Sequence, residues 1–192
     1  VVLRDEKVRQ SELAIYALAP SFSEDKTASL ALDVASEILG GGKTSRIYKA
    51  LVVEQKLASS AGFYYSGSSI GPGTAVLYAD PLPGIAPEDL EKAMLSVLSE
   101  FVKEGPDQEE VSEAITRLQN AAIYARDSLQ GPAMIFGRSL SSGMTIEDIE
   151  YWPHDLEQIT REDVANAAQN HLDFNRTVTS VLLPEEEHEQ NE

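Results

Sequence analysis

The sequence predicts an α+β domain in which a mixed, mostly antiparallel sheet packs against a layer of helices. Two observations carry this prediction. The expected elements run in the order strand, two helices, hairpin, several helices and strand, without the strict alternation of a doubly wound parallel sheet. The spacing of apolar residues is alternating at the two ends of the chain and helical in much of the rest. No internal repeat is visible, so residues 1–184 are expected to form a single domain.

The first third of the chain predicts a strand followed by two helices. Apolar residues alternate loosely over residues 9–19, and Pro20 ends this run, which indicates a strand. The glycine run 40–42 ends the first helix, and a second helix is expected over about residues 45–55. The first helix is predicted from apolar residues on one face, namely Ala31, Val34, Ala35, Ile38 and Leu39.

The remainder of the chain predicts a hairpin, a run of helices and a last strand. Residues 58–68 are expected to pair with residues 74–80 across a glycine-rich turn. Pro87 suits the first turn of a helix, and residues 176–183 read as a strand. Residues 185–192 form an acidic tail that we expect to be disordered. Capping-box-like signals begin three further helices, at Asp107, Thr145 and Thr160. Trp152 and Pro153 are expected to form a turn between two helices.

Composition narrows the possible functions. The 192 residues carry a formal net charge of −17, which argues against nucleic-acid binding. The acidity either serves solubility or steers basic peptides to the surface. Cysteine is absent, which excludes disulfides and thiolate chemistry. No window is long and apolar enough to predict a membrane span. The N-terminus shows neither a signal peptide nor an initiator methionine, so we expect a piece of a longer polypeptide.

No motif in the sequence predicts a catalytic or metal site. The histidines His154, His171 and His188 are too far apart for an HExxH or HxxEH pair, so no metal ligand is assigned. A GxSxG nucleophile elbow is absent. The GGKT run is similar to the end of a phosphate loop, but Glu37 stands where the first glycine of that motif would lie. A helix cap and a tight turn explain the run better.

One long segment carries a family resemblance. The stretch ILGGGKTSRIYKALVVEQKLASSAGFYY, residues 38–65, resembles the LGGG-x-SRL-(aromatic) segment in the C-terminal domain of pitrilysin/insulinase-type zinc peptidases. The closing stretch TREDVANAAQNHLDFNRTVTSVLLP also resembles that domain, and the likeness covers residues 5–184. It implies a C-terminal half that walls a chamber for peptides. The zinc ligands of such a protein lie in its N-terminal half, so the resemblance implies zinc in the intact protein and none in this chain.

The resemblance also defines two positions at which functional side chains are missing. Family members often carry an arginine and, seven residues later, a tyrosine that bind the substrate backbone and stabilise the oxyanion. Val52 and Ser59 stand at these positions. Because some bacterial members are heterodimers that divide these functions, we expect the zinc-bearing subunit, whose partner supplies the pair in trans. The expected partners are its own N-terminal half, a second family subunit and a peptide substrate. The resemblance also suggests a periplasmic or membrane-associated location.

Two other functions remain open. The same family fold also serves as an inactive core subunit of respiratory complexes, in which the pair is equally expected to be absent. An unrelated α+β binding module is the third interpretation. This segment alone is expected to be inactive as an enzyme in each case.

A few residues are expected to shape the domain. We expect Gly40, Gly41 and Gly42 to adopt positive φ in a close turn between helices. Ser45 and Arg46 begin the next helix, and Arg46 is either an interdomain ion pair or a helix-surface charge. The aromatic run at residues 63–65 is expected to pack within the sheet.

Overall fold

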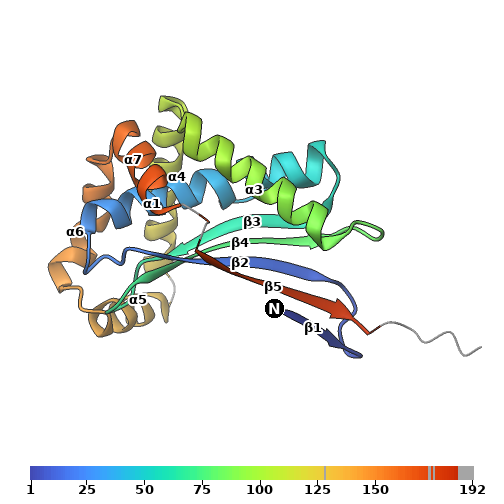
Figure 1. Cartoon of the computed structure of the whole chain (residues 1–192). Helices are drawn as coiled ribbons and strands as arrows, with labels where there is room; N and C mark the ends of the chain where they lie inside the picture. Colours follow the sequence, from blue (N-terminus) through green and yellow to red (C-terminus); the bar gives the residue numbers. More distant parts are fainter. Residues whose placement is uncertain (128, 173, 175, 186–192) are drawn as a thin grey trace, which may run out of the picture.

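The chain forms one sheet with a layer of helices over it (Figure 1). The computed structural model describes residues 1–127, 129–172, 174 and 176–185. The sheet contains β1 (Val2–Asp5), β2 (Glu12–Ala19), β3 (Ala58–Ser66), β4 (Gly73–Pro81) and β5 (Thr177–Pro184). The helical elements are α1 (Lys26–Gly40), α2 (Arg46–Tyr48), the π-helix η1 (Lys49–Glu54), α3 (Pro87–Glu104), α4 (Gln108–Asp127), α5 (Gly131–Ser141), α6 (Ile146–Glu157) and α7 (Arg161–His171).

The strand order is β1-β5-β2-β4-β3. Three of the four pairings are antiparallel, and only β1 runs parallel to its neighbour β5. The predicted fold class, a mixed and mostly antiparallel sheet packed against helices, is therefore confirmed. The hairpin of β3 and β4 and the last strand also lie where the sequence predicts them.

The core lies between the sheet and the helices. Along β4 every second residue is buried, because successive side chains point to opposite faces of a strand. The buried face of the sheet packs against apolar residues of α1 and α3, among them Leu39 and Phe101. The opposite face exposes a row that runs across four strands, because the register aligns Tyr64, Val76, Tyr16 and Val178.

Capping explains where several helices begin. The side chains of Thr145 and Thr160 accept hydrogen bonds from the backbone three residues later, and Asp148 and Asp163 accept from the backbone of the cap residues. These are two of the three capping boxes that the sequence predicts. Each box satisfies backbone N–H groups that have no partner within the helix.

The structure corrects three predictions. Strand β1 was not predicted, because its four residues are exposed and show no alternation. The second helix is a short α turn continued by a π-helix. Trp152 and Pro153 lie inside α6 and form no turn between helices. A proline lacks the N–H that an inner helical turn normally uses, so tertiary packing of α6 outweighs the local preference.

No helix in the described part of the chain combines the length and the apolar character that crossing a membrane requires.

Candidate functional site

The glycine run joins α1 to the edge of the sheet. A Cβ on Gly40, the last residue of α1, would overlap the backbone nitrogen and carbonyl oxygen of Phe63 in β3. A Cβ on Gly41 would overlap Glu37, whereas Gly42 has open space and a φ of +107°. Of the three glycines, Gly42 alone adopts a positive φ. The expectation of positive φ along the whole run is wrong, because at Gly40 and Gly41 the requirement is space.

Helix α1 also hydrogen-bonds to strand β3. The backbone N–H of Tyr65 donates to the hydroxyl of Ser36, over 3.2 Å. The phenol of Tyr65 donates to the carbonyl of Pro20 and lies 2.9 Å from the hydroxyl of Ser29. Burial raises the pKa of this phenol. Because β3 is an edge strand, α1 covers backbone groups that would otherwise be open to another strand.

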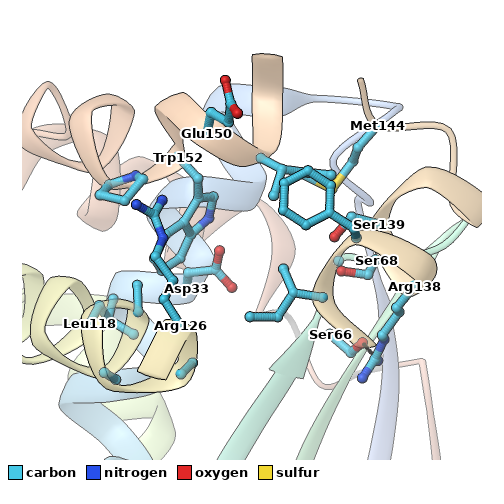
Figure 2. Close-up of a pocket in the computed structure, with 18 of the residues that line it drawn as sticks. Asp33, Ser66, Ser68, Leu118, Arg126, Arg138, Ser139, Met144, Glu150 and Trp152 are labelled. Atoms are coloured by element: carbon cyan, nitrogen blue, oxygen red, sulfur yellow. Dashed lines mark hydrogen bonds between the residues drawn. The ribbon is translucent and has the colours of Figure 1, made fainter. Parts of the chain in front are cut away.

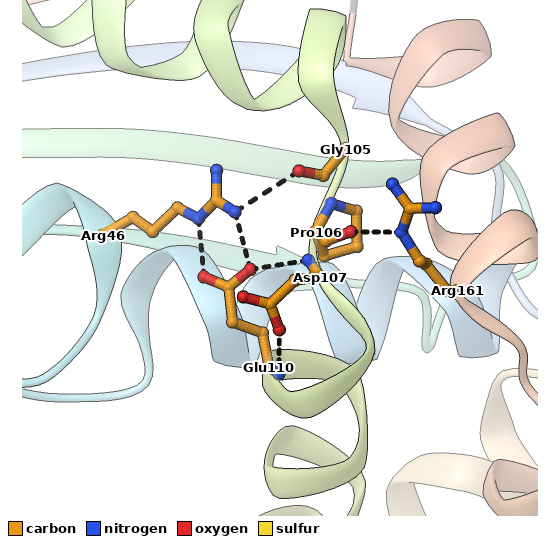
Figure 3. Close-up of polar contacts among 6 residues, drawn as sticks. All are labelled: Arg46, Gly105, Pro106, Asp107, Glu110 and Arg161. Carbon is orange, nitrogen blue, oxygen red and sulfur yellow. Dashed lines mark hydrogen bonds and ion pairs between the residues drawn. The ribbon is translucent and has the colours of Figure 1, made fainter.

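Arg46 is engaged within this chain (Figure 3). Its Nε and Nη2 atoms donate to the two carboxylate oxygens of Glu110 over 2.7 and 2.6 Å, and Nη2 also donates to the carbonyl of Gly105. The guanidinium lies 5.1 Å from the centre of the Phe101 ring. The bond from Arg46 lowers the pKa of Glu110. A bidentate pair of this kind is stronger and more directional than a single hydrogen bond. The predicted interdomain contact of Ser45 and Arg46 stays a prediction.

The same glutamate caps helix α4. Glu110 accepts a hydrogen bond from the backbone of Asp107, and the Asp107 carboxylate accepts one from the backbone of Glu110. Nearby, Nε of Arg161 donates to the carbonyl of Pro106 over 2.6 Å (Figure 3). The predicted cap at Asp107 is confirmed, and it is shared with an ion pair to a residue 64 positions earlier. We call Arg46, Glu110 and Asp107 the Arg46 cluster.

The positions expected for the arginine and tyrosine pair have other surroundings. Val52 lies in η1, is partly buried and packs against the core. Ser59 lies in β3 at an irregularity in the register, where it is paired with no residue of β4, and its hydroxyl lies 3.4 Å from the carbonyl oxygen of Asp80. Its hydroxyl accepts a hydrogen bond from the side chain of Gln10 over 2.7 Å. Neither side chain offers a donor array for an oxyanion.

A cavity of about 830 Å³ lies beside the helical layer (Figure 2). Residues 64–68 at the end of β3 line it, together with residues of α1, α4, α5 and α6. Figure 2 shows the carboxylate of Asp33 directed toward the interior. Most of the wall is apolar and includes Leu118, Ile135, Phe136, Met144, Ile149 and Trp152. This cavity was not predicted from the sequence, because its walls come from segments more than 100 residues apart.

The fold and these residues can be compared with known proteins. A family model described as the peptidase M16 inactive domain matches residues 1–118, more than half of the chain. The chain belongs to the M16 peptidase family. This is the zinc peptidase family that the LGGG segment predicts, and the model is that of its inactive domain. No curated protein matches this M16 domain.

Solved structures share the fold of the M16 domain at low sequence identity. A protease from Helicobacter pylori is 22% identical with a TM-score of 0.84, over 96% of this chain and 43% of that one. The inactive peptidase domain of a candidate zinc protease from Bordetella parapertussis is 22% identical with a TM-score of 0.81, over 96% and 98%. A chain of complex III2 from Candida albicans is 16% identical with a TM-score of 0.77, over 96% of this chain and 45% of that one. The M16 domain thus spans less than half of the Helicobacter chain.

The histidines of the M16 domain lie apart. His154 lies within α6 and not in a turn, and its Nδ1 is 3.4 Å from the carboxylate of Glu157 on the surface. His171 is the last residue of α7, and His188 lies outside the described residues. Within the described ranges, no group of three or more histidine, aspartate or glutamate side chains is placed to hold a metal ion.

Proposed function

We propose that this chain is the C-terminal, non-zinc-binding half of a zinc metallopeptidase, in the subunit that bears zinc on its N-terminal half. A second family subunit supplies the arginine and tyrosine in trans, and peptides are cleaved in a chamber between the halves. The observation that carries this proposal is the replacement of that pair by Val52 and Ser59 within an M16 inactive domain.

The surroundings of the two residues support the proposal. Val52 contributes to packing, and Ser59 is held by Gln10. A guanidinium donates two parallel hydrogen bonds to an oxyanion or a peptide carbonyl, and neither valine nor serine can replace it. Zinc would activate the attacking water from the N-terminal half. The C-terminal half, which is this chain, would then contribute a wall and a partner surface, without a group that touches the reacting atoms.

A second function is favoured by one comparison. The likeness in fold to a chain of complex III2 supports a structural role, in which no peptide is cleaved. The missing pair fits that role equally well. The two proposals differ in whether the longer polypeptide holds zinc.

The experiment begins with the reading frame upstream of Val1. An intact HxxEH motif followed by a glutamate, with about one zinc per chain by mass spectrometry, is expected for the peptidase. The intact polypeptide should then cleave an unfolded peptide only after the second subunit is added. A polypeptide without zinc would overturn the peptidase proposal in favour of the structural one. Full activity of the purified polypeptide alone would contradict the heterodimer.

A gain-of-function variant tests the pair directly. In the intact polypeptide, Val52→Arg combined with Ser59→Tyr is expected to give measurable cleavage without the second subunit. The matched control is Val53→Arg combined with Ser59→Tyr, because Val53 is the exposed neighbour of Val52 on η1. Equal activity of the two double variants would show that position 52 has no special relation to the substrate.

A further inference from the structure

The cavity beside α1 combines an apolar wall with one partly buried acid. Its volume of about 830 Å³ lies in the range of small-molecule sites. Sites of this kind bind a ligand through apolar contact and orient it through a few polar groups. Asp33 is the acid that faces the interior, and α1 fixes it at a position surrounded by core residues on either side along the helix (Figure 2).

Asp33 has no cation to compensate its charge. Burial raises its pKa to about 7, and the hydrogen bond from the Trp152 side chain opposes that rise. None of the described arginine, lysine or histidine side chains forms an ion pair with it. An unpaired carboxylate in an apolar site is costly in its ionised form. A cation that enters the cavity would remove this cost, so the site is ready for a positively charged group.

The other charged residues around the cavity leave Asp33 free. Arg126, Arg138 and Glu150 also line it. Nη2 of Arg138 donates to the hydroxyl of Ser66 over 2.9 Å, and Figure 2 shows this pair on the side opposite Asp33. Arg126 and Glu150 are exposed. None of the three contributes to the altered pKa of Asp33, which has burial as its main cause.

We propose that this cavity binds an organic cation, that is, a single amine, amidine or guanidine group carried on an apolar body. Asp33 is the counter-ion of the cationic group. The indole of Trp152 donates a hydrogen bond to the Asp33 carboxylate and lines the same cavity. The apolar wall takes up the body of the ligand. The net charge of −17 favours the approach of cations to the protein. This proposal does not depend on the proposed peptidase function.

Two sources share this chemistry. One is a free small-molecule amine, and the other is a lysine or arginine side chain that a peptide inserts between apolar neighbours. Both place one cationic nitrogen beside Asp33. The experiment therefore uses a probe for each source.

The test uses fluorescence of the whole 192-residue chain. Trp152 is its single tryptophan and lines the cavity, so a change in tryptophan emission reports on this site. The first pair of probes is 4-phenylbutylamine and 4-phenylbutan-1-ol, which differ in charge at the same length. The second pair is acetyl-Leu-Lys-Leu-amide and acetyl-Leu-norleucine-Leu-amide. At pH 8 we expect each cationic probe to bind at least about tenfold more tightly than its neutral partner if its source is correct.

A conservative variant assigns the effect to Asp33. Asp33→Asn keeps the size of the side chain and should weaken binding of the cationic probe at least about tenfold, with little change for the neutral one. Glu150→Gln removes an exposed carboxylate from the same cavity and should leave binding unchanged. Affinity should also fall below pH 7 as Asp33 is protonated. Preference for the cation in one pair alone would identify the source.

Three outcomes would overturn the proposal. The first is that no cationic probe changes the tryptophan emission up to millimolar concentration. The second is equal affinity for the charged and neutral members of both pairs. The third is undiminished binding of the cationic probe by Asp33→Asn when circular dichroism shows an unchanged fold.

Discussion

The two ends of helix α4 lie beside carboxylates in different surroundings. At the first turn, Glu110 is bound by both donor atoms of the Arg46 guanidinium, and Val111 and Ala114 are fully buried. Near the other end, Ile123 and Tyr124 are 60% and 76% exposed, and the helix lines the cavity that contains the unpaired Asp33. One helix therefore joins a closely packed region to an open one.

The comparison shows two uses of an acid inside a fold. A carboxylate that is paired and hydrogen-bonded loses little by being buried and fixes the elements around it. An unpaired carboxylate lowers stability, and stability is commonly sacrificed where a ligand is to be bound. The closely packed region comprises α1, β3 and the Arg46 cluster. The open region comprises the second half of α4 with α5 and α6.

The largest expected effect comes from breaking the closely packed region. Gly40→Ala places a Cβ on the backbone of Phe63, which cannot move without displacing β3. We expect a loss of at least about 3 kcal/mol in the free energy of unfolding, and Gly40→Val should not fold stably. Urea denaturation followed by circular dichroism measures this. Stability equal to that of the parent chain would show that α1 and β3 are not closely packed.

A smaller effect, of opposite sign for the two acids, is expected from their pH dependence. Because the pKa of Asp33 is raised from 3.8 to about 7, the folded state keeps a proton that the unfolded state has lost in this interval. Stability should therefore fall as the pH rises from about 4 to 7. Asp33→Asn should remove this slope and stabilise the protein at pH 8 by about 2 kcal/mol.

Glu110 gives the matched comparison. Its pKa is lowered by Arg46, so its contribution is present above its ordinary value of 4.5 and is lost as the pH falls through the folded value. Glu110→Gln should therefore destabilise the protein at pH 7 by about 1 kcal/mol, and by less in acid. Urea titrations at pH 4, 6 and 8 measure both variants. A slope of the same sign for both acids would remove the distinction between the two ends of α4.

The smallest effect is expected in the open region. Gly137 lies inside α5, and nothing lies within 4 Å of the position that a Cβ would take. Gly137→Ala should stabilise the protein by about 0.5–1 kcal/mol, because alanine is the better helix former. Measurement of the melting temperature checks this, and we expect a rise of a few degrees. A fall would mean that α5 packs against a surface that the single chain does not contain.

Local signals allowed much of the fold to be predicted from sequence. The cap at Asp107 and those at Thr145 and Thr160 depend on residues three positions apart, so the sequence contains both partners. Pro153 led to the prediction of a turn at a position that lies inside α6. The packing of the helix, including the hydrogen bond from Gln119 to the carbonyl of Pro153, decides its course, and that partner lies 34 residues earlier.

The cavity could not be predicted from the sequence, because it too depends on contacts between residues far apart in the chain. Asp33 stands on the polar side of the periodic pattern in α1, where a solvated acid is the simplest expectation. Trp152, whose side chain donates a hydrogen bond to Asp33, lies more than 100 residues away. Arg46 likewise meets Glu110 across 64 residues. In both cases the sequence contains both residues, but it does not show that the fold brings them together.

Strand β1 has a consequence for the order in which the chain can fold. It pairs with β5 alone in the described sheet, in register from Val2 with Val181, so β1 can find its neighbour only after β5 has been made. The edge of β2 that β5 later occupies also stays open until then. Contacts of such sequence separation slow folding. During synthesis the incomplete sheet is therefore exposed to pairing with other chains, and the eight residues of β5 close it.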